Sequence, residues 1–194
     1  MSENKKLDFI GTFKEGIGIG LKNIVPIIVN FILFILTCWI PHFGGGVIIG
    51  FVVGVMTKAS KGETIPMTEV FDAKYRKFMG EYFLTNGLMA AGAAMAFTNA
   101  ISLVYAWRFA AAIAVDKGKG SSEAITLSNL STYGSKFLMF IIDVLVCIVI
   151  GILASIFMMI PGIGWLLCLL VIIVFCCVYT GINASIYKQL TSNI

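Results

Sequence analysis

Two opposite charges, Arg108 and Asp143, stand inside long apolar stretches of the sequence. Arg108 precedes Asp116 by eight residues, and Asp143 follows Lys136 by seven. At the rise of an α-helix, these spacings place the two charges roughly 12 Å and 10 Å from the charged ends of their stretches. A charge near the centre of a bilayer costs at least about 2.5–3.5 kcal/mol, and pairing would relieve much of that cost. We therefore expect an intramembrane charge pair.

Two roles fit this pair. In a polar path, Arg108 would contact an anion or a lipid headgroup, and Asp143 would gate that contact. In a purely structural role, the pair would be a buried salt bridge that fixes the register of two helices. Few other polar residues accompany the pair, apart from amides such as Asn86 and Asn183 that can bridge helices. The sequence favours the structural role and leaves both open.

Three glycines, Gly46, Gly50 and Gly54, recur at four-residue spacing within an apolar stretch. A helix brings them onto one face without side chains, which another backbone can approach closely. Packing between helices of one subunit fits this pattern. Packing between subunits around a pore fits it as well.

The chain offers little for catalysis or for metal binding. His42 is the only histidine, and the spacing of the five cysteines matches no zinc site. The Gly-rich run at residues 16–20 lacks the Lys-Ser/Thr pair of a phosphate loop. The sequence contains no Ser-His-Asp set, no paired-carboxylate site and no basic stripe with interleaved aromatic residues. We therefore expect no enzyme, no metal, no cofactor and no nucleic-acid partner.

The elements that must position these residues are three long apolar stretches, residues 23–57, 83–115 and 137–187. The chain is 59% hydrophobic and only 12% charged, whereas a soluble domain carries about a quarter charged residues. Of the 14 Lys and Arg residues, only Arg108 lies within the core of a stretch. Cytoplasmic loops of membrane proteins carry an excess of basic residues. The stretches are therefore expected to cross or enter a membrane.

Each stretch has a turn signal without Lys or Arg near its middle: Pro41-His42, Thr98-Asn99 and Pro161-Gly162. The pattern predicts one integral membrane domain, residues 1–194, of three helical hairpins with both termini and every basic loop in the cytoplasm. A spanning helix needs about 20 residues, which residues 136–160 and 163–187 satisfy.

The segments 24–40, 44–57, 83–97 and 100–115 are shorter. They either span with their ends drawn in or form partly re-entrant hairpins buried in protein. We predict an all-α polytopic bundle of six helices, and a four-span arrangement remains an alternative.

An amphipathic stretch precedes each hairpin. The second carries an aromatic stripe opposite charged residues, and Thr68 is a candidate N-cap. The stripe consists of Phe71, Tyr75, Phe78 and Tyr82. The first carries Leu7, Ile10, Phe13, Ile17 and Leu21 at helical spacing, and in the third Ser121 or Ser122 can cap a short helix. A helix of this kind suits the headgroup plane, or packs on the bundle as an ordinary loop helix. For residues 68–82 we expect the headgroup plane.

One stretch of the chain carries a recognisable set of residues. These are Trp107, Ala114-Val115-Asp116, Glu123-Ala124, Ser128, Tyr133-Gly134, Lys136 and Phe140. They resemble a pattern in poorly characterised bacterial six-span integral membrane families related to the membrane domain of glycerophosphodiester phosphodiesterases. The resemblance covers about residues 100–190 and departs at Thr98-Asn99-Ala100, where such proteins often have Pro-Gly-Ile. It implies a helical bundle in a bacterial cytoplasmic membrane. It implies no catalytic residues, because these 194 residues include no hydrolase domain.

These features predict a non-enzymatic, homo-oligomeric membrane protein. It would form a passage for a small solute or ion, or a lipid-facing scaffold, with the charge pair and the glycine face along any passage. The alternative is an accessory subunit that binds a partner membrane protein through cytoplasmic helices at residues 68–82 and 121–134. The expected partners are thus membrane lipids, further copies of the chain, or that partner protein.

Overall fold

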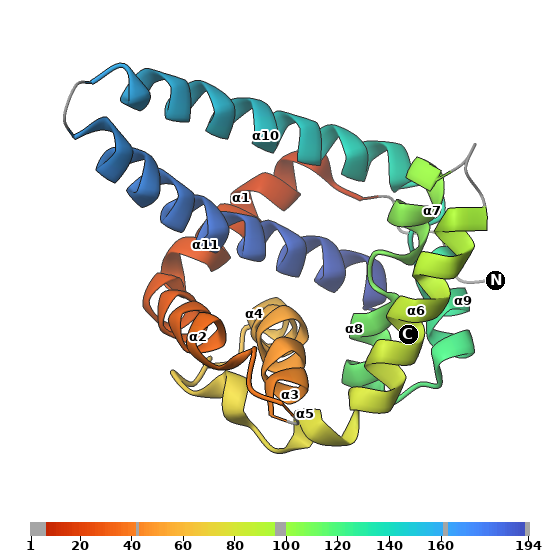
Figure 1. Ribbon diagram of the computed structural model, residues 1–194. Helices are drawn as coiled ribbons and strands as arrows, with labels where there is room; N and C mark the ends of the chain where they lie inside the picture. Colours follow the sequence, from red (N-terminus) through yellow and green to blue (C-terminus); the bar gives the residue numbers. More distant parts are fainter. Residues whose placement is uncertain (1–6, 42, 96–99, 161–162, 193–194) are drawn as a thin grey trace.

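The computed structural model describes residues 7–41, 43–95, 100–160 and 163–192, and every regular element among them is a helix (Figure 1). The all-α prediction is confirmed. The three turns predicted at His42, Thr98-Asn99 and Pro161-Gly162 fall wholly or partly outside the described residues.

Two of the described helices are long and apolar enough to cross a membrane, α10 (Lys136–Met158, 23 residues) and α11 (Gly164–Thr191, 28 residues). A third crossing results if α1 (Phe9–Lys22) and α2 (Ile24–Thr37), which bend by 71° at Asn23, form one broken span. The remaining helices each fall short of the roughly 20 residues that a crossing needs. The prediction of six spans is therefore not confirmed, whereas two to three helices of the described chain are long and apolar enough to cross a membrane.

The shorter helices follow in chain order. They are α3 (Gly44–Ile49), the π-helical η1 (Gly50–Val55), α4 (Met56–Lys61), the 3₁₀ turn η2 (Glu69–Phe71), α5 (Lys74–Lys77), α6 (Met79–Met95), α7 (Ala100–Trp107), α8 (Ala110–Lys117) and α9 (Ser121–Ser131). Helices α3, η1 and α4 form one continuous helical run.

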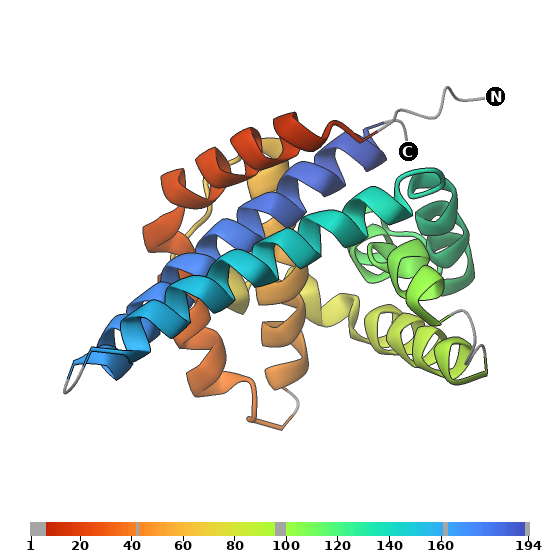
Figure 2. The ribbon, with the colours of Figure 1, turned by 90° about the horizontal axis from the view of Figure 1, so that it is seen from above.

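The end of the α10–α11 hairpin projects away from the other helices (Figure 2). Ile148, Val149 and Ile152 on α10 and Trp165 and Leu169 on α11 are all exposed there. Side chains of this kind need an apolar environment, which the hydrocarbon core of a bilayer supplies.

Helix α1 lies along the C-terminal half of α11 (Figure 2). The contact is made by Gly16 and Gly20 of α1 with Gly181 of α11. A Cβ atom on Gly16 would lie only 2.6 Å from the Cα atom of Ile182. Glycines let the two backbones meet without side chains between them, as in membrane helix pairs.

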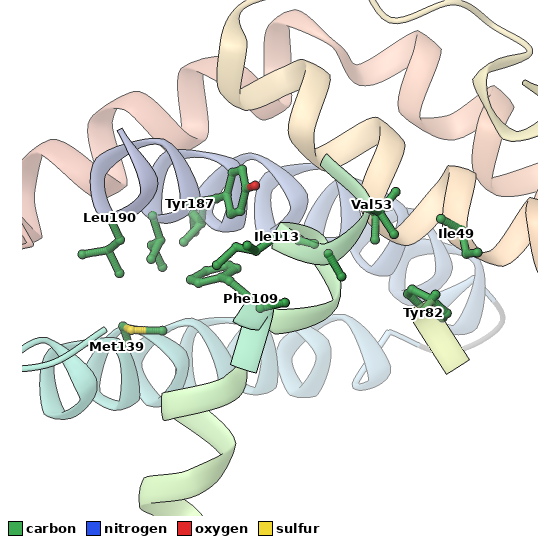
Figure 3. Close-up of a cluster of buried hydrophobic side chains, with 14 of the residues drawn as sticks. Ile49, Val53, Tyr82, Phe109, Ile113, Met139, Tyr187 and Leu190 are labelled. Atoms are coloured by element: carbon green, nitrogen blue, oxygen red, sulfur yellow. The ribbon is translucent and has the colours of Figure 1, made fainter. Parts of the chain in front are cut away.

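The main core joins α8, α10 and α11 (Figure 3). Phe109 and Ile113 pack there with Met139 and Tyr187, and all four side chains are almost fully buried. The rings of Phe109 and Tyr187 meet edge to face, with 5.5 Å between their centroids. Because Phe109 is held in this core, the position of the preceding residue, Arg108, is fixed as well.

The single helix predicted over residues 68–82 is wrong, because η2, α5 and the first turn of α6 are separate there. Tyr75 and Tyr82 are buried in the protein, so the four aromatic side chains do not form one exposed stripe. Thr68 makes no capping hydrogen bond. Likewise Gly120, rather than Ser121 or Ser122, occupies the N-cap of α9.

Instead, this segment folds back along the helical run of α3 and η1. A Cβ atom on Gly50 would lie 2.7 Å from the Cα atom of Val70. The guanidinium of Arg76 lies 5.5 Å from the centroid of the Phe43 ring, next to the turn between α2 and α3. Two regions that the sequence assigned to opposite sides of the membrane therefore lie side by side. This arrangement fits the re-entrant alternative for the first hairpin.

Buried polar side chains form hydrogen bonds with the backbone groups of this irregular segment. Asn30 of α2 is fully buried, donates to the Pro66 carbonyl (2.8 Å) and accepts from the Val70 N–H (3.1 Å). Glu69 is buried as well, 2.7 Å from the Lys58 ammonium, and accepts from the Tyr75 hydroxyl. Burial and the Glu69 carboxylate raise the pKa of Tyr75, so its hydroxyl stays protonated and keeps donating.

The close approach of Arg76 to Gly46 predicts a disulfide. A Cβ atom on Gly46 would lie 3.0 Å from Cγ and 3.9 Å from Cα of Arg76, so two cysteines at these positions would be near enough for a disulfide. With the five native cysteines replaced by alanine, Gly46→Cys with Arg76→Cys should crosslink on mild oxidation, as detected by mass spectrometry of the joined peptides. Gly46→Cys with Lys77→Cys is the matched control and should crosslink much less. A continuous helix over residues 68–82 in the headgroup plane would leave both pairs unlinked.

Candidate functional site

The site begins at a break in a helix. Helix α7 ends at Trp107, α8 begins at Ala110, and Arg108 and Phe109 form the turn between them. The Ser128 hydroxyl of α9 donates to the Ala106 carbonyl (2.9 Å) and accepts from the Phe109 N–H (3.3 Å). The hydroxyl of Thr132, the C-cap residue of α9, donates to the same carbonyl (3.2 Å). Because both hydroxyls are fully buried, the break is satisfied within the protein.

Arg108 extends from this break to α10 and α11. Its Nη1 and Nη2 donate to the two carboxylate oxygens of Asp143, at 2.6 and 3.1 Å. The Asn183 side-chain oxygen accepts from Nε (3.2 Å) and Nη2 (2.8 Å), and the Tyr179 hydroxyl accepts from Nη2 (2.9 Å). The structure thus brings the two predicted charges together in a forked pair, the geometry in which Arg recognises a carboxylate most strongly.

Two tyrosines complete the cluster around Asp143. The Tyr105 hydroxyl donates to Oδ2 (2.9 Å), and the Tyr179 hydroxyl lies 3.4 Å from Oδ1. The side chains of Arg108 and Asp143 are only 14% and 19% exposed. The cluster is therefore compact, hydrogen-bonded throughout and without net charge.

A cavity of about 530 Å³ lies against this cluster. Its lining comes from four helices: Asn86, Met89 and Ala90 of α6; Leu103, Val104, Tyr105 and Trp107 of α7; Asp143 of α10; and Tyr179 and Asn183 of α11, together with Arg108. Five of the lining side chains belong to the polar cluster, Asn86 adds an amide from α6, and the others are mainly apolar. Cavities of several hundred Å³ with a few convergent polar groups are typical of small-molecule sites.

The other predicted site residues lie elsewhere. Gly46, Gly50 and Gly54 are buried beneath residues 70–76 of the same chain. Their face packs closely within one subunit, but the partner consists of the short helical turns η2 and α5 rather than of one long helix. Because residues 70–76 cover this face, it neither lines a pore nor contacts another copy of the chain. Phe71, Tyr75, Phe78 and Tyr82 likewise pack within the protein and not at the cavity.

Tyr105 and Tyr179 were not singled out from the sequence. Helical spacing contains a signal for both, because Tyr105 precedes Arg108 by three residues and Tyr179 precedes Asn183 by four. Residues three or four apart share a helix face. No cluster of His, Cys, Asp and Glu suited to a metal ion occurs within the described part of the chain.

No protein-family model, no curated protein and no solved structure matches the chain. The resemblance to the six-span bacterial families therefore stays a prediction.

The pairing of Arg108 with Asp143 predicts strong energetic coupling. Removing one partner of a buried pair leaves an uncompensated charge and costs about 3–5 kcal/mol, whereas an apolar replacement of both is often nearly neutral. Arg108→Met and Asp143→Leu should each lower the thermal stability of the purified protein strongly, and the double variant should recover most of the loss. If the double variant loses as much thermal stability as the two single variants lose together, the two charges act independently.

Proposed function

We propose that this chain is a non-enzymatic, multi-pass membrane protein in which the cavity beside Arg108 forms part of a passage for a small solute. The observation that carries the proposal is the position of a charged, hydrogen-bonded cluster at a break between two helices, α7 and α8, and at the wall of a cavity. Ionisable residues within membrane segments commonly mark solute pathways. Discontinuous helices commonly build the binding sites of transporters.

The charge balance of the cluster favours an uncharged solute over an ion. Arg108 is matched by Asp143, and its remaining contacts are with the neutral groups of Tyr179 and Asn183. An anion would have to displace Asp143 from the guanidinium, and a cation would have to displace the guanidinium from Asp143. A neutral molecule that exchanges hydrogen bonds with tyrosine and asparagine side chains requires neither step.

The membrane arrangement that we propose is that of a bacterial cytoplasmic membrane, with both termini on the cytoplasmic side. The placement of both termini on one side is supported by the contact of the residue before α1 with the last turns of α11, where the Asp8 N–H donates to the Gln189 side chain (3.1 Å). Six helical segments would enter the membrane in three hairpins, and the first would be re-entrant. Copies of the chain would associate through the exposed apolar side chains of α11, such as Trp165 and Leu169, since the glycine face is covered.

A second candidate function is an accessory subunit that binds a partner membrane protein. Three large side chains near the start of α10 favour it, because Leu130, Tyr133 and Phe137 are 60%, 67% and 73% exposed within eight residues. The segment 68–82 contributes less to this alternative than the sequence implied, because two of its four aromatic side chains are buried. A lipid-facing scaffold would use the same exposed apolar surfaces.

A solute-uptake assay tests the proposed passage. Purified protein is reconstituted in liposomes, and entry of the neutral solutes glycerol and urea is followed by light scattering, beside chloride and potassium fluxes. We expect the protein to speed entry of at least one neutral solute and to leave both ion fluxes at the level of empty liposomes.

A matched pair of variants tests whether entry of the neutral solute depends on the cavity. Ala90 lines the cavity and its neighbour Ala91 does not, although both are exposed on α6. Ala90→Trp should fill the cavity and abolish entry, and Ala91→Trp should leave entry unchanged. If liposomes that contain correctly folded protein admit none of the four solutes faster than empty liposomes do, the proposed passage is contradicted. An ion flux that Ala90→Trp abolishes would support the passage but contradict its preference for neutral solutes.

A further inference from the structure

The outer face of α1 is an apolar stripe that no other described part of the chain covers. Ile10, Ile17 and Leu21 are 76%, 41% and 50% exposed, and Lys14 stands on the same face by helical spacing. The sequence pattern made these residues the apolar side of an amphipathic helix. In the structure this side points away from the bundle, because the small residues Thr12, Gly16 and Gly20 face α11 instead.

Polar contacts fix the direction in which this face points. Glu15 accepts from the Ser185 hydroxyl (3.0 Å) and pairs with the Lys188 ammonium. The Gln189 amide donates to the Thr12 hydroxyl (3.1 Å). These contacts, with the glycine packing, hold α1 along α11, so the apolar stripe cannot turn inward without breaking them.

Two lysines on α1 have no ion-pair partner among the described residues. Lys14 lies within the apolar stripe and Lys22 lies at its C-terminal end, and both are exposed. By contrast, Lys58, Lys61 and Lys74 each pair with a carboxylate. A helix with an exposed apolar stripe and unpaired lysines at its edge suits the boundary between headgroups and acyl chains, where lysine extends its ammonium to the headgroups.

The chain next to α1 continues into an apolar helix. After the bend of 71° at Asn23, α2 begins, and Val25 in its first turn is 56% exposed. The exposed apolar side chains of α1 are thus followed directly by those of α2, and the bent pair is either a broken span or a re-entrant loop. A bend of this size is what the chain needs to pass from the membrane surface into its interior.

We propose that the outer face of α1 is a contact surface for anionic phospholipid, with the ammonium groups of Lys14 and Lys22 on the lipid phosphates and Ile10, Ile17 and Leu21 among the upper acyl chains. A second copy of the chain is a poorer occupant. Twofold contacts between copies are self-complementary, and one centred on this stripe would bring the two Lys14 side chains together. The surface is independent of the Arg108 cavity and of the proposed passage.

Quenching by brominated lipids tests this surface on the whole protein in liposomes. A bimane fluorophore is attached at Ile17→Cys, in a variant whose five native cysteines are replaced by alanine. Brominated phosphatidylglycerol should quench it more strongly than brominated phosphatidylcholine. Replacing Lys14 and Lys22 by glutamine should lower the relative association constant for phosphatidylglycerol by about fivefold for each lysine.

The matched control is a bimane at Ile152→Cys on the exposed outer half of α10, which has no lysine beside it. The two brominated lipids should quench it equally. Equal quenching at position 17 would overturn the preference for anionic lipid. Quenching at position 152 with none at position 17 would overturn the lipid surface itself and show that protein or water covers α1.

Discussion

One constraint governs this structure: a backbone that leaves the helical path among apolar surroundings must find hydrogen-bond partners inside the protein. Ser128 meets this constraint at the break between α7 and α8, where it binds both Ala106 and Phe109. Asn30 meets it for the segment that folds back along η1, where it binds Pro66 and Val70. In both places a fully buried side chain from an element distant in sequence holds an irregular backbone.

The charge pair follows from the first of these breaks. Phe109 turns into the core between α8, α10 and α11, and the residue before it, Arg108, extends to Asp143 and Asn183. Asp143, Tyr179 and Asn183 come from the two helices that are long enough to cross a membrane. The site is thus built by the α10–α11 pair on one side and by a broken helix on the other. A cavity lies where these two parts meet, and its polar wall is the cluster itself.

Features that depend on counting along one helix could be predicted from the sequence. The lengths of α10 and α11 follow from the apolar stretch, and the pairing of Arg108 with Asp143 follows from their similar distances to the nearest charges along the chain. The fold-back of residues 63–78 could not be predicted in this way. The spacing of its aromatic residues fits a continuous helix equally well, and the groups that decide against that helix, Asn30 and Gly50, lie far away in sequence. Only at Gly50 does another backbone approach closely, whereas Gly54 meets the Tyr75 ring, and the glycine spacing carries no information on either partner.

Hydrogen–deuterium exchange of the protein in lipid nanodiscs tests the central claim most directly. Ser128→Ala removes the partner of the Phe109 N–H and should speed exchange in the peptide over residues 106–112 by about tenfold to a hundredfold, since an unmade buried hydrogen bond costs about 1–3 kcal/mol. The same variant should leave the peptide over residues 66–72 unchanged, and Asn30→Ala should produce the opposite pattern. Exchange over residues 106–112 that is identical with and without the Ser128 hydroxyl would contradict the account, because the break would then be held by something other than α9.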